Sequence, residues 1–284
     1  MNIGNGEFHG LPALRIGTAL ASAAISLHGG QLLSYVPRGF EDLLWLSPLS
    51  KRAPDAIRGG VPVCWPYFGR EGQAPDVPQH GFARNTRWKL LDARIDEAGV
   101  AIVELALPEK AGFPLRLQQT LRIGSELRQS LSTYNTGTTP IAFTQALHSY
   151  FRVGDAERVH VAGLEGLQYA DRYDGQRHAQ SGEWNLQDPR DPGRSDRTYQ
   201  DTGKRFTLFD PVLGRRIELE TSGSRSLVVW NPGAAGIAAI GDAPADGWRE
   251  FVCLEATNAG GDVIHLAPGE IHVLAQRVTA SGKP

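Results

Sequence analysis

Alternation of apolar and polar residues with a period of two recurs along most of this chain. Between Leu115 and Ile123, aliphatic residues dominate the odd-numbered positions, whereas Arg116, Gln118 and Arg122 occupy even-numbered ones. Successive side chains of a β-strand point to opposite faces, so this segment is predicted to be a half-buried strand. Similar runs are found at 86–95, 100–107, 127–134, 158–164, 205–209, 215–220, 227–230, 251–255 and 271–278.

Turn-forming residues separate these runs, for example Asn135-Thr136-Gly137 and Asp210-Pro211. No segment shows helical periodicity over three turns, and strands do not alternate with helices, so a parallel α/β sheet is not expected. The sequence therefore predicts an all-β protein built as one large antiparallel β-sandwich.

The segment 171–203 departs from this pattern. It is rich in Gly, Pro, Asp and Arg and poor in aliphatic residues. We expect it to run as a long excursion over the sandwich, and loops of this length are usually functional or disordered. No linker or internal repeat is evident elsewhere, so a single domain over residues 1–284 is predicted.

Composition and charge exclude several classes of protein. The chain is 41% hydrophobic and 21% charged, close to globular averages, which argues against disorder. It lacks both a signal-peptide pattern at its start and an apolar run of roughly 18 residues, so no membrane contact is expected. A net charge of −2, with arginines spread singly, argues against nucleic acid as a partner. A cytoplasmic monomer is the expectation.

Cys64 and Cys253 are the only cysteines. They are too few for a disulfide scaffold and lack metal-ligand spacing, so reduced, buried thiols are predicted. A bridge between Cys64 and Cys253 is the alternative, and no metal site is expected.

Arginines next to glycines and aromatic residues mark the first candidate site segments. Arg58 lies in the run 57–69, and the run 79–84 carries Gln79, His80 and Arg84. Glycines beside Arg58 and His80 allow the backbone to approach a ligand closely. A guanidinium group can bind two phosphate oxygens at once, so Arg58 and Arg84 could clamp a phosphate. The alternative is that both are ordinary surface arginines.

Two further runs place an ionisable residue among apolar ones. His148 lies in the run 144–151, and histidine is suited to proton transfer near neutral pH. Glu255 ends an apolar strand, where an unpartnered carboxylate is costly, so it is either paired or functional. The structural alternatives are a histidine satisfied by backbone partners and a salt-bridged glutamate.

Several motifs in a fixed order carry a family resemblance, which extends from about Leu11 to Val278. The chain resembles the hexose-6-phosphate mutarotases, also called glucose-6-phosphate 1-epimerases, of the aldose 1-epimerase superfamily. The motifs are Ile57-Arg58-Gly59-Gly60-Val61-Pro62, Gln79-His80-Gly81-Phe82-Ala83-Arg84, Asn135-Thr136-Gly137, Ala146-Leu147-His148-Ser149-Tyr150-Phe151, Trp230-Asn231-Pro232 and Val252-Cys253-Leu254-Glu255.

The resemblance implies a sandwich of the galactose-mutarotase type, with the sugar lying across one concave face. It implies that His148 is the catalytic acid and Glu255 the catalytic base, without a metal ion or organic cofactor. The substrate-binding positions implied in the same way are Arg58, Gln79, Arg84 and Asp196, with His80 lining the site.

Asp196 has two alternatives among the neighbouring aspartates. It begins Asp196-Arg197-Thr198-Tyr199, which matches an Asp-Arg-x-Tyr pattern of the family. Asp171 and Asp174 belong to the same irregular segment, so either is an alternative for the contact with the sugar.

The implied activity is interconversion of the α and β anomers of a hexose 6-phosphate, a small-molecule sugar phosphate, by ring opening and reclosure. One group must remove a proton from the C1 hydroxyl while another protonates the ring oxygen. With ordinary pKa values of about 4.3 and 6.5, a glutamate is ionised at neutral pH and a histidine is mostly neutral. We therefore expect a nearby anion to raise the protonated fraction of His148.

Three other functions compete with this one. An epimerase for unphosphorylated aldoses would use the same acid and base without an arginine clamp. A non-catalytic carbohydrate-binding protein would need no such pair. A glycosidase would need two carboxylates at a set separation, and the sequence offers Glu255 no evident second carboxylate.

Overall fold

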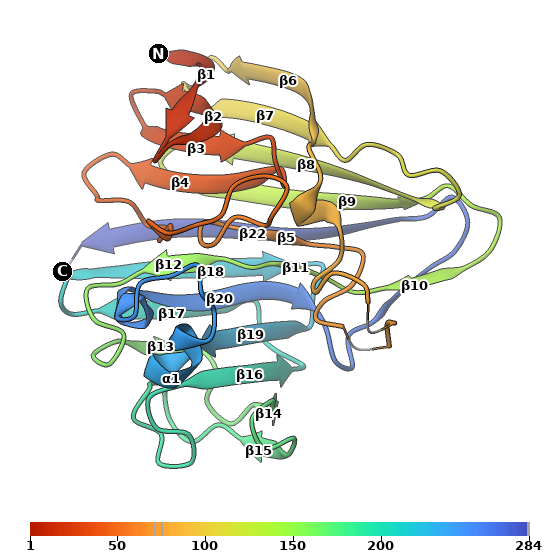
Figure 1. Cartoon of the computed structure of the whole chain (residues 1–284). Helices are drawn as coiled ribbons and strands as arrows, with labels where there is room; N and C mark the ends of the chain where they lie inside the picture. The colour runs from red at the N-terminus through yellow and green to blue at the C-terminus, as the bar shows by residue number, and fades with distance from the viewer. Residues whose placement is uncertain (71, 75, 283–284) are drawn as a thin grey trace.

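The computed structural model describes residues 1–70, 72–74 and 76–282. Within them the chain forms an antiparallel β-sandwich, which confirms the predicted fold class (Figure 1). Two large sheets pack face to face around one extensive hydrophobic core, to which both contribute leucine, valine and aromatic side chains. Every pairing between named strands is antiparallel (for example β19 with β20 and β22 with β9).

The front sheet has the order β15-β14-β16-β19-β20-β11-β5, and β12 also pairs with β20. Its strands are β5 (Val63–Cys64), β11 (Gln145–Leu147), β12 (Tyr150–Arg152), β14 (Gln168–Asp171), β15 (Arg177–Ala179), β16 (Ser195–Gln200), β19 (Ser226–Asn231) and β20 (Phe251–Asn258).

The back sheet has the order β13-β17-β18-β22-β9-β8-β7-β6. Its strands are β6 (Lys89–Ile95), β7 (Ala101–Ala106), β8 (Leu115–Ile123), β9 (Leu127–Asn135), β13 (His160–Ala162), β17 (Arg205–Asp210), β18 (Arg215–Ser222) and β22 (Ile271–Gly282).

Smaller elements complete the described structure. A four-stranded sheet, drawn in red at the top of Figure 1, contributes to the same core. It comprises β1 (Asn2–Phe8), β2 (Leu11–Gly17), β3 (Ala21–Ser26) and β4 (Gln31–Pro37). The remaining elements are the strand pair β10 (Ile141–Phe143) and β21 (Ile264–Leu266), the helix α1 (Gly233–Ala238) and the 3₁₀ turns η1 (Ala83–Asn85) and η2 (Gly247–Glu250).

The period-two pattern predicted the back sheet well. β8 has the predicted bounds, with its odd-numbered residues buried and most even-numbered ones exposed. The pattern missed β1 to β4, where the inward-facing residues of β3 include Ala21 and Ala23. Alanine has a low strand propensity and a small apolar surface, so such a strand gives a weak signal.

The excursion predicted over 171–203 is wrong in part, because residues 195–200 form β16 in the middle of the front sheet. The strand was not predicted because one of its inward-facing residues is an arginine, which interrupts the apolar alternation. Arg197 points inward and is only 1% exposed. It donates hydrogen bonds to Asp188 at 2.8 Å and Gln180 at 3.0 Å, which compensate its burial.

Two further observations bear on the sequence analysis. Cys64 and Cys253 are both free and buried, as predicted. Among the described residues, α1 and the short turns fall far short of the length and apolar character of a bilayer-crossing helix.

Candidate active site

Strand register brings His148 and Glu255 together. On one side of β20, Leu147 of β11 pairs with Ala256 and Tyr150 of β12 pairs with Cys253. Both pairs share one register, so continuing it places His148 directly opposite Glu255. Residues opposite each other in an antiparallel pair have Cβ atoms about 4.5–5.5 Å apart. Two residues distant in sequence therefore become neighbours on the face of the front sheet that points away from the core.

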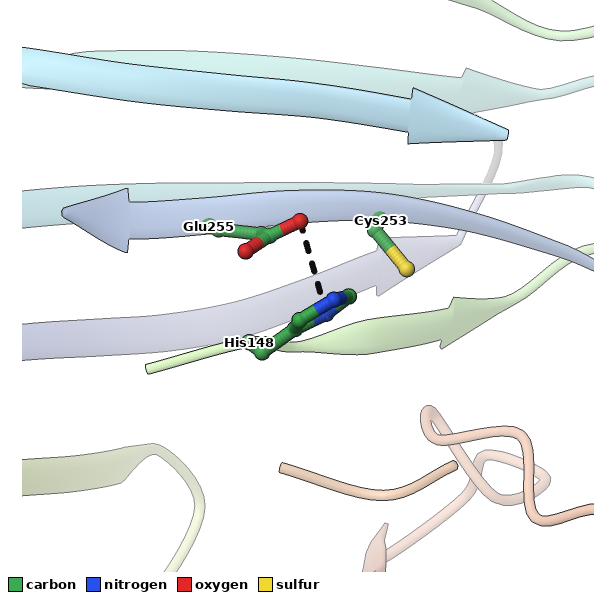
Figure 2. Close-up of side chains that lie close together, drawn as sticks. All are labelled: His148, Cys253 and Glu255. Atoms are coloured by element: carbon green, nitrogen blue, oxygen red, sulfur yellow. Dashed lines mark ion pairs between the residues drawn. The ribbon is translucent and has the colours of Figure 1, made fainter. Parts of the chain in front are cut away.

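The two side chains are close, buried and incompletely hydrogen-bonded. Nδ1 of His148 lies 3.4 Å from Oε1 of Glu255, the contact dashed in Figure 2. His148 is 7% exposed and Glu255 1%. Neither Nδ1 of His148 nor Oε2 of Glu255 has a hydrogen-bond partner among the described residues. Buried polar atoms are nearly always satisfied, so exceptions of this kind indicate a functional site.

Stacking fixes the plane of the imidazole. The rings of His148 and Tyr150 lie 4.8 Å apart at an interplanar angle of 8°. Trp230 of β19 meets the same imidazole edge-on, with ring centres 5.7 Å apart. The histidine is thus held in one orientation before any ligand binds.

Cys253 lies beside the pair, on the same face of β20 as Glu255 (Figure 2). One donor atom each from His148, Cys253 and Glu255 falls within 4.8 Å of the others, and such a nitrogen, sulfur and oxygen set could bind zinc. A thiol must lose its proton to bind a metal ion. Burial raises the pKa of Cys253 well above its ordinary value, which opposes that loss.

A cavity of about 290 Å³ opens above the pair. This is just below the lower end of the range of about 300–1,000 Å³ found for small-molecule sites, and it suits a single sugar unit better than a polymer. All seven residues predicted for the site line it: Arg58, Gln79, His80, Arg84, His148, Asp196 and Glu255. The other lining residues are Phe68, Arg172, Val228, Trp230 and Ile240.

A larger hollow of about 600 Å³ lies elsewhere, on the outer face of the back sheet. Charged residues line it, but several of them are paired with one another, as in Arg277 with Glu220 and Arg205 with Glu220. It contains no buried acid–base pair among the described residues. The smaller cavity is therefore the candidate active site.

Arg58 and Arg84, the two arginines predicted to clamp a phosphate, have different hydrogen-bond and ion-pair partners. Nε of Arg58 pairs with Oδ1 of Asp242 at 3.0 Å, and its Nη1 donates to the hydroxyl of Tyr150 at 3.1 Å. Nη2 of Arg84 donates to the backbone oxygen of Gln79 at 2.9 Å. Nε of Arg84 is buried without a partner among the described residues. Within the described part of the chain, Arg84 therefore keeps hydrogen-bonding capacity and has no ion-pair partner, whereas the charge of Arg58 is matched by Asp242.

His80 presents one fixed tautomer to the cavity. The backbone N–H of Gly69 donates to Nδ1 of His80 at 3.1 Å, so the ring proton of a neutral His80 resides on Nε2. Burial lowers the pKa of His80 well below 6.5, and the charges of Arg84, His148, Arg172 and Arg58 act in the same direction. A neutral imidazole with a free N–H suits a sugar hydroxyl.

Of the three candidate aspartates, only Asp196 lines the cavity. Asp171 is buried and accepts a hydrogen bond from the backbone of Tyr173, while Asp174 pairs with His178 at the surface. Burial raises the pKa of Asp196 to about 6, against the opposing charge of Arg172. Asp196 also raises the pKa of Glu255, so the cavity holds a second carboxylate near Glu255, one that the sequence analysis considered only for binding the sugar.

Burial controls the protonation of the central pair. It raises the pKa of Glu255 well above 4.5, with a further increase from Asp196 and opposing effects of Arg84 and Arg172. It lowers the pKa of His148 well below 6.5, in the same direction as the charges of Arg84 and Arg58. In the free protein both shifts favour the uncharged forms of the two groups, a protonated Glu255 and a neutral His148. The free protein shows no increase in the protonation of His148, and an increase caused by the substrate phosphate stays a prediction.

The sequence analysis missed two lining residues of chemical interest. In the sequence Trp230 stands out only as part of the motif Trp230-Asn231-Pro232, although an indole face is a common platform for a sugar ring. Arg172 lies in the segment interpreted as an excursion, directly after β14. Its only sequence signal is its place next to Asp171, one of the aspartates considered for the site.

The fold and the site together define a class of protein. A buried histidine–glutamate pair lies at the floor of a sugar-sized cavity on one face of a large antiparallel sandwich. The chain belongs to the aldose 1-epimerase family, whose model matches residues 12–279. The family resemblance seen in the sequence is thereby confirmed.

Curated relatives cover most of the chain. A protein of Escherichia coli, provisionally named glucose-6-phosphate 1-epimerase, is 38% identical over 84% of this chain and 80% of its own length. A protein of Salmonella typhimurium with the same provisional name is 36% identical over 84% of this chain and 80% of its own length.

Solved structures agree on the fold. The crystal structure of a provisionally named mutarotase from Salmonella typhimurium has a TM-score of 0.89 and 30% identity, covering 99% of this chain and 94% of that one. A galactose mutarotase-like protein of Clostridium acetobutylicum, at 14% identity, covers 99% of this chain and 98% of its own with a TM-score of 0.73. The latter shows that the fold is shared.

Proposed function

We propose that this protein interconverts the α and β anomers of a hexose 6-phosphate, most directly glucose 6-phosphate. The observation that carries the proposal is the pairing of His148 with Glu255, 3.4 Å apart at the floor of a cavity that Arg84 also lines. Membership of the aldose 1-epimerase family supports the reaction type. The names of the curated relatives support the phosphorylated substrate.

Anomer exchange is a proton transfer at two oxygens. Glu255 as the base removes the proton of the C1 hydroxyl, while His148 as the acid protonates the ring oxygen, and the C1–O5 bond breaks to give the aldehyde. Rotation about C1–C2 then presents the other carbonyl face, and closure reverses both proton transfers. Every proton taken up is returned, so the reaction balances without an added cofactor.

The pair needs one proton in total to act in this way. Moving the proton of Glu255 to His148, across the 3.4 Å between them, creates the carboxylate base and the imidazolium acid together. A substrate dianion near the cavity favours the imidazolium. The neutral resting pair and the reactive ion pair thus differ only in where the shared proton resides.

The pH dependence of kcat follows from this proton count. Because the pKa of His148 is lowered, a second proton binds only below 6.5, and activity falls there. Because the pKa of Glu255 is raised, the pair loses its single proton only well above 4.5, and activity falls again at high pH. We expect a bell-shaped profile. A profile with a single limb, falling only as pH rises through 6.5, would contradict the shared-proton model.

We propose that Arg84 and Arg58 bind the phosphate and that Gln79, His80 and Asp196 bind sugar hydroxyls. Replacing Arg84 with alanine removes a charge that has no ion-pair partner among the described residues and that this proposal assigns to the phosphate rather than to the reacting carbon. Charge-assisted hydrogen bonds of this kind contribute about 1.5–3 kcal/mol, so we expect KM for glucose 6-phosphate to rise about 10- to 100-fold. The effect on glucose should be small, and equal losses for both sugars would rule out this role.

The proposed function is tested by comparing two substrates with wild-type protein. Catalysed anomerisation of glucose 6-phosphate and of glucose is followed by polarimetry, with the spontaneous rate of each subtracted. A clear preference in kcat/KM for the phosphorylated sugar supports the proposal. Preference for glucose would instead favour an epimerase for free aldoses, and binding without turnover of either sugar would favour a carbohydrate-binding protein.

Three features of the protein stay predictions in this proposal. They are a single domain over residues 1–284, a monomeric state and a cytoplasmic location. Size-exclusion chromatography with light scattering checks the second.

A further inference from the structure

We propose that Ser149 and Gln276 position the imidazole of His148 through a hydrogen bond that crosses the core between the two large sheets. Both are positioning residues, because they act through His148 and not on the sugar. The inference rests on the proposed function, since it concerns the acid of the proposed pair. It makes the interior of the sandwich, as well as the cavity lining, a determinant of the rate.

The backbone at His148 departs from regular strand geometry. β11 ends at Leu147 and β12 begins at Tyr150, so His148 and Ser149 lie between two strands that both pair with β20. The N–H of Ser149 donates to the carbonyl oxygen of Leu147 at 3.0 Å. A hydrogen bond between residues two apart makes His148 the central residue of a γ-turn. The direction of the imidazole therefore depends on this turn as well as on the strand ladder.

Ser149 points into the core, in the direction opposite to His148. Its side chain is fully buried, and its hydroxyl donates to Oε1 of Gln276 at 2.9 Å. Gln276 belongs to β22 in the back sheet and is 2% exposed. This hydrogen bond ties the residue that follows His148 to the opposite layer of the sandwich.

Two more buried glutamines continue the connection across the back sheet. Nε2 of Gln276 donates to Oε1 of Gln129 at 2.9 Å, and Nε2 of Gln129 donates to Oε1 of Gln119 at 2.8 Å. Nε2 of Gln119 donates to the carbonyl oxygen of Gly30 at 2.6 Å. A carbonyl oxygen can only accept, so it fixes the orientation of each amide in turn. Gln276 therefore presents its oxygen to Ser149 in one fixed orientation.

This network is costly within a hydrophobic core. Transferring amide and hydroxyl groups out of water is unfavourable, and their mutual hydrogen bonds chiefly offset that cost. Apolar residues of similar size would fill the same space. A fully connected buried network instead fixes one arrangement of the elements that carry it. Here the element at the end of the network is the turn that presents His148.

Backbone hydrogen bonds hold this turn within the plane of the front sheet. The N–H of His148 donates to the carbonyl oxygen of Pro62 at 3.0 Å, and the N–H of Leu254 donates to that of Ser149 at 3.2 Å. The hydrogen bond from Ser149 to Gln276 runs between the layers. It therefore sets the depth of the turn, a direction that bonds between neighbouring strands do not control.

Proton transfer is sensitive to that depth. Nδ1 of His148 already lies 3.4 Å from Oε1 of Glu255, which is long for a hydrogen bond. A misplacement of about 1 Å at a reacting group can lower a rate about 10²-fold. Release of the turn from the back sheet should therefore lower kcat more than it affects binding.

Ser149→Ala tests the inference, with kcat and KM for glucose 6-phosphate measured by polarimetry at a temperature where circular dichroism shows folded protein. We expect kcat to fall about 10- to 100-fold, while KM changes less than about three-fold. Gln276→Met keeps the size of the side chain but removes the acceptor, and it should give a similar loss. Ser149→Thr keeps the hydroxyl and should restore most of kcat.

Tyr35→Phe is the matched control. It also removes one buried hydroxyl, which donates to the carbonyl oxygen of Gly124 at 3.0 Å, but it lies in β4 and outside the cavity lining. Both Tyr35→Phe and Ser149→Ala should lower Tm, by roughly 2–10 °C. The control should keep kcat within about three-fold of wild type. Equal losses of kcat in the two variants would overturn the inference, because activity would then follow overall stability.

Combination with His148→Asn separates this inference from the proposed function. Because Ser149 acts through His148, adding Ser149→Ala to His148→Asn should cause no further loss of kcat. A further 10-fold loss, or a wild-type kcat in folded Ser149→Ala, would overturn the inference. A low rate in His148→Asn alone would then leave the proposed function standing. A wild-type rate in His148→Asn would overturn the proposed function and this inference with it.

Discussion

His148→Asn and Glu255→Gln are each expected to lower kcat for glucose 6-phosphate by about 10²- to 10⁴-fold, the usual contribution of a general acid or base. Asparagine and glutamine keep the size and polarity of the originals but cannot exchange a proton. KM should change little, because the reacting oxygens gain these contacts mainly in the transition state. Polarimetry at saturating substrate measures the effect.

The double variant sharpens this prediction. Because the two residues share one proton, losing either disables the pair, and the double variant should be scarcely slower than the worse single variant. Cys253→Ala is a suitable control, since Cys253 lies beside the pair on β20 but outside the cavity lining. It should retain kcat within a few-fold of wild type. Additive losses in the double variant would show that the two groups act independently.

Gly81→Ala is expected to destabilise the fold strongly. Gly81 has φ +76°, and an added Cβ would lie 1.9 Å from the backbone oxygen of Trp65. Backbone strain and steric overlap of this kind each cost about 1–3 kcal/mol, which together should lower Tm by roughly 5–15 °C in a chain of this size. Thermal unfolding followed by circular dichroism measures the shift.

Gly72→Ala provides the control for this substitution. Gly72 has a similar φ of +70°, but among the described residues an added Cβ meets nothing within 4 Å. Gly72→Ala should lower the free energy of unfolding only by the cost of the left-handed conformation, about 1–2 kcal/mol. Equal destabilisation in the two variants would mean that the approach of Gly81 to Trp65 does not matter. The close packing of Gly81 on Trp65 also positions His80 in the cavity wall, because the backbone N–H of Trp65 donates to the carbonyl oxygen of His80 at 3.1 Å.

Much of the site could be predicted because it is built from local motifs. Arg58 and His80 stand beside glycines, Arg84 ends the same short motif as His80, and His148 and Glu255 interrupt apolar strands. Those contrasts are visible in sequence, and together they carried the resemblance to the family that the chain belongs to.

What the sequence could not provide is strand register. A shift of one residue would turn Glu255 into the core, and only the pairing of Leu147 with Ala256 and of Tyr150 with Cys253 fixes His148 opposite it. Register depends on contacts between residues more than 100 positions apart. Protonation was unpredictable for a related reason, since the burial that governs the pKa values of both groups exists only in the folded protein.

Arg172 and Arg197 illustrate a further limit of pattern analysis. Both lie in the segment 171–203, whose polar composition resembles a loop. Arg197 is an inward-facing strand residue compensated by Asp188, and Arg172 lines the cavity. An arginine that replaces an apolar core residue removes the alternation by which strands are recognised.

Exchange NMR of glucose 6-phosphate tests the acid–base pair most directly, because it measures α–β interconversion at equilibrium without a coupling enzyme. Wild-type protein in catalytic amounts should produce exchange cross-peaks between the anomeric protons far above the spontaneous rate, and folded Glu255→Gln should return the rate close to spontaneous. Exchange at the wild-type rate in Glu255→Gln would contradict the assignment of this carboxyl as the base.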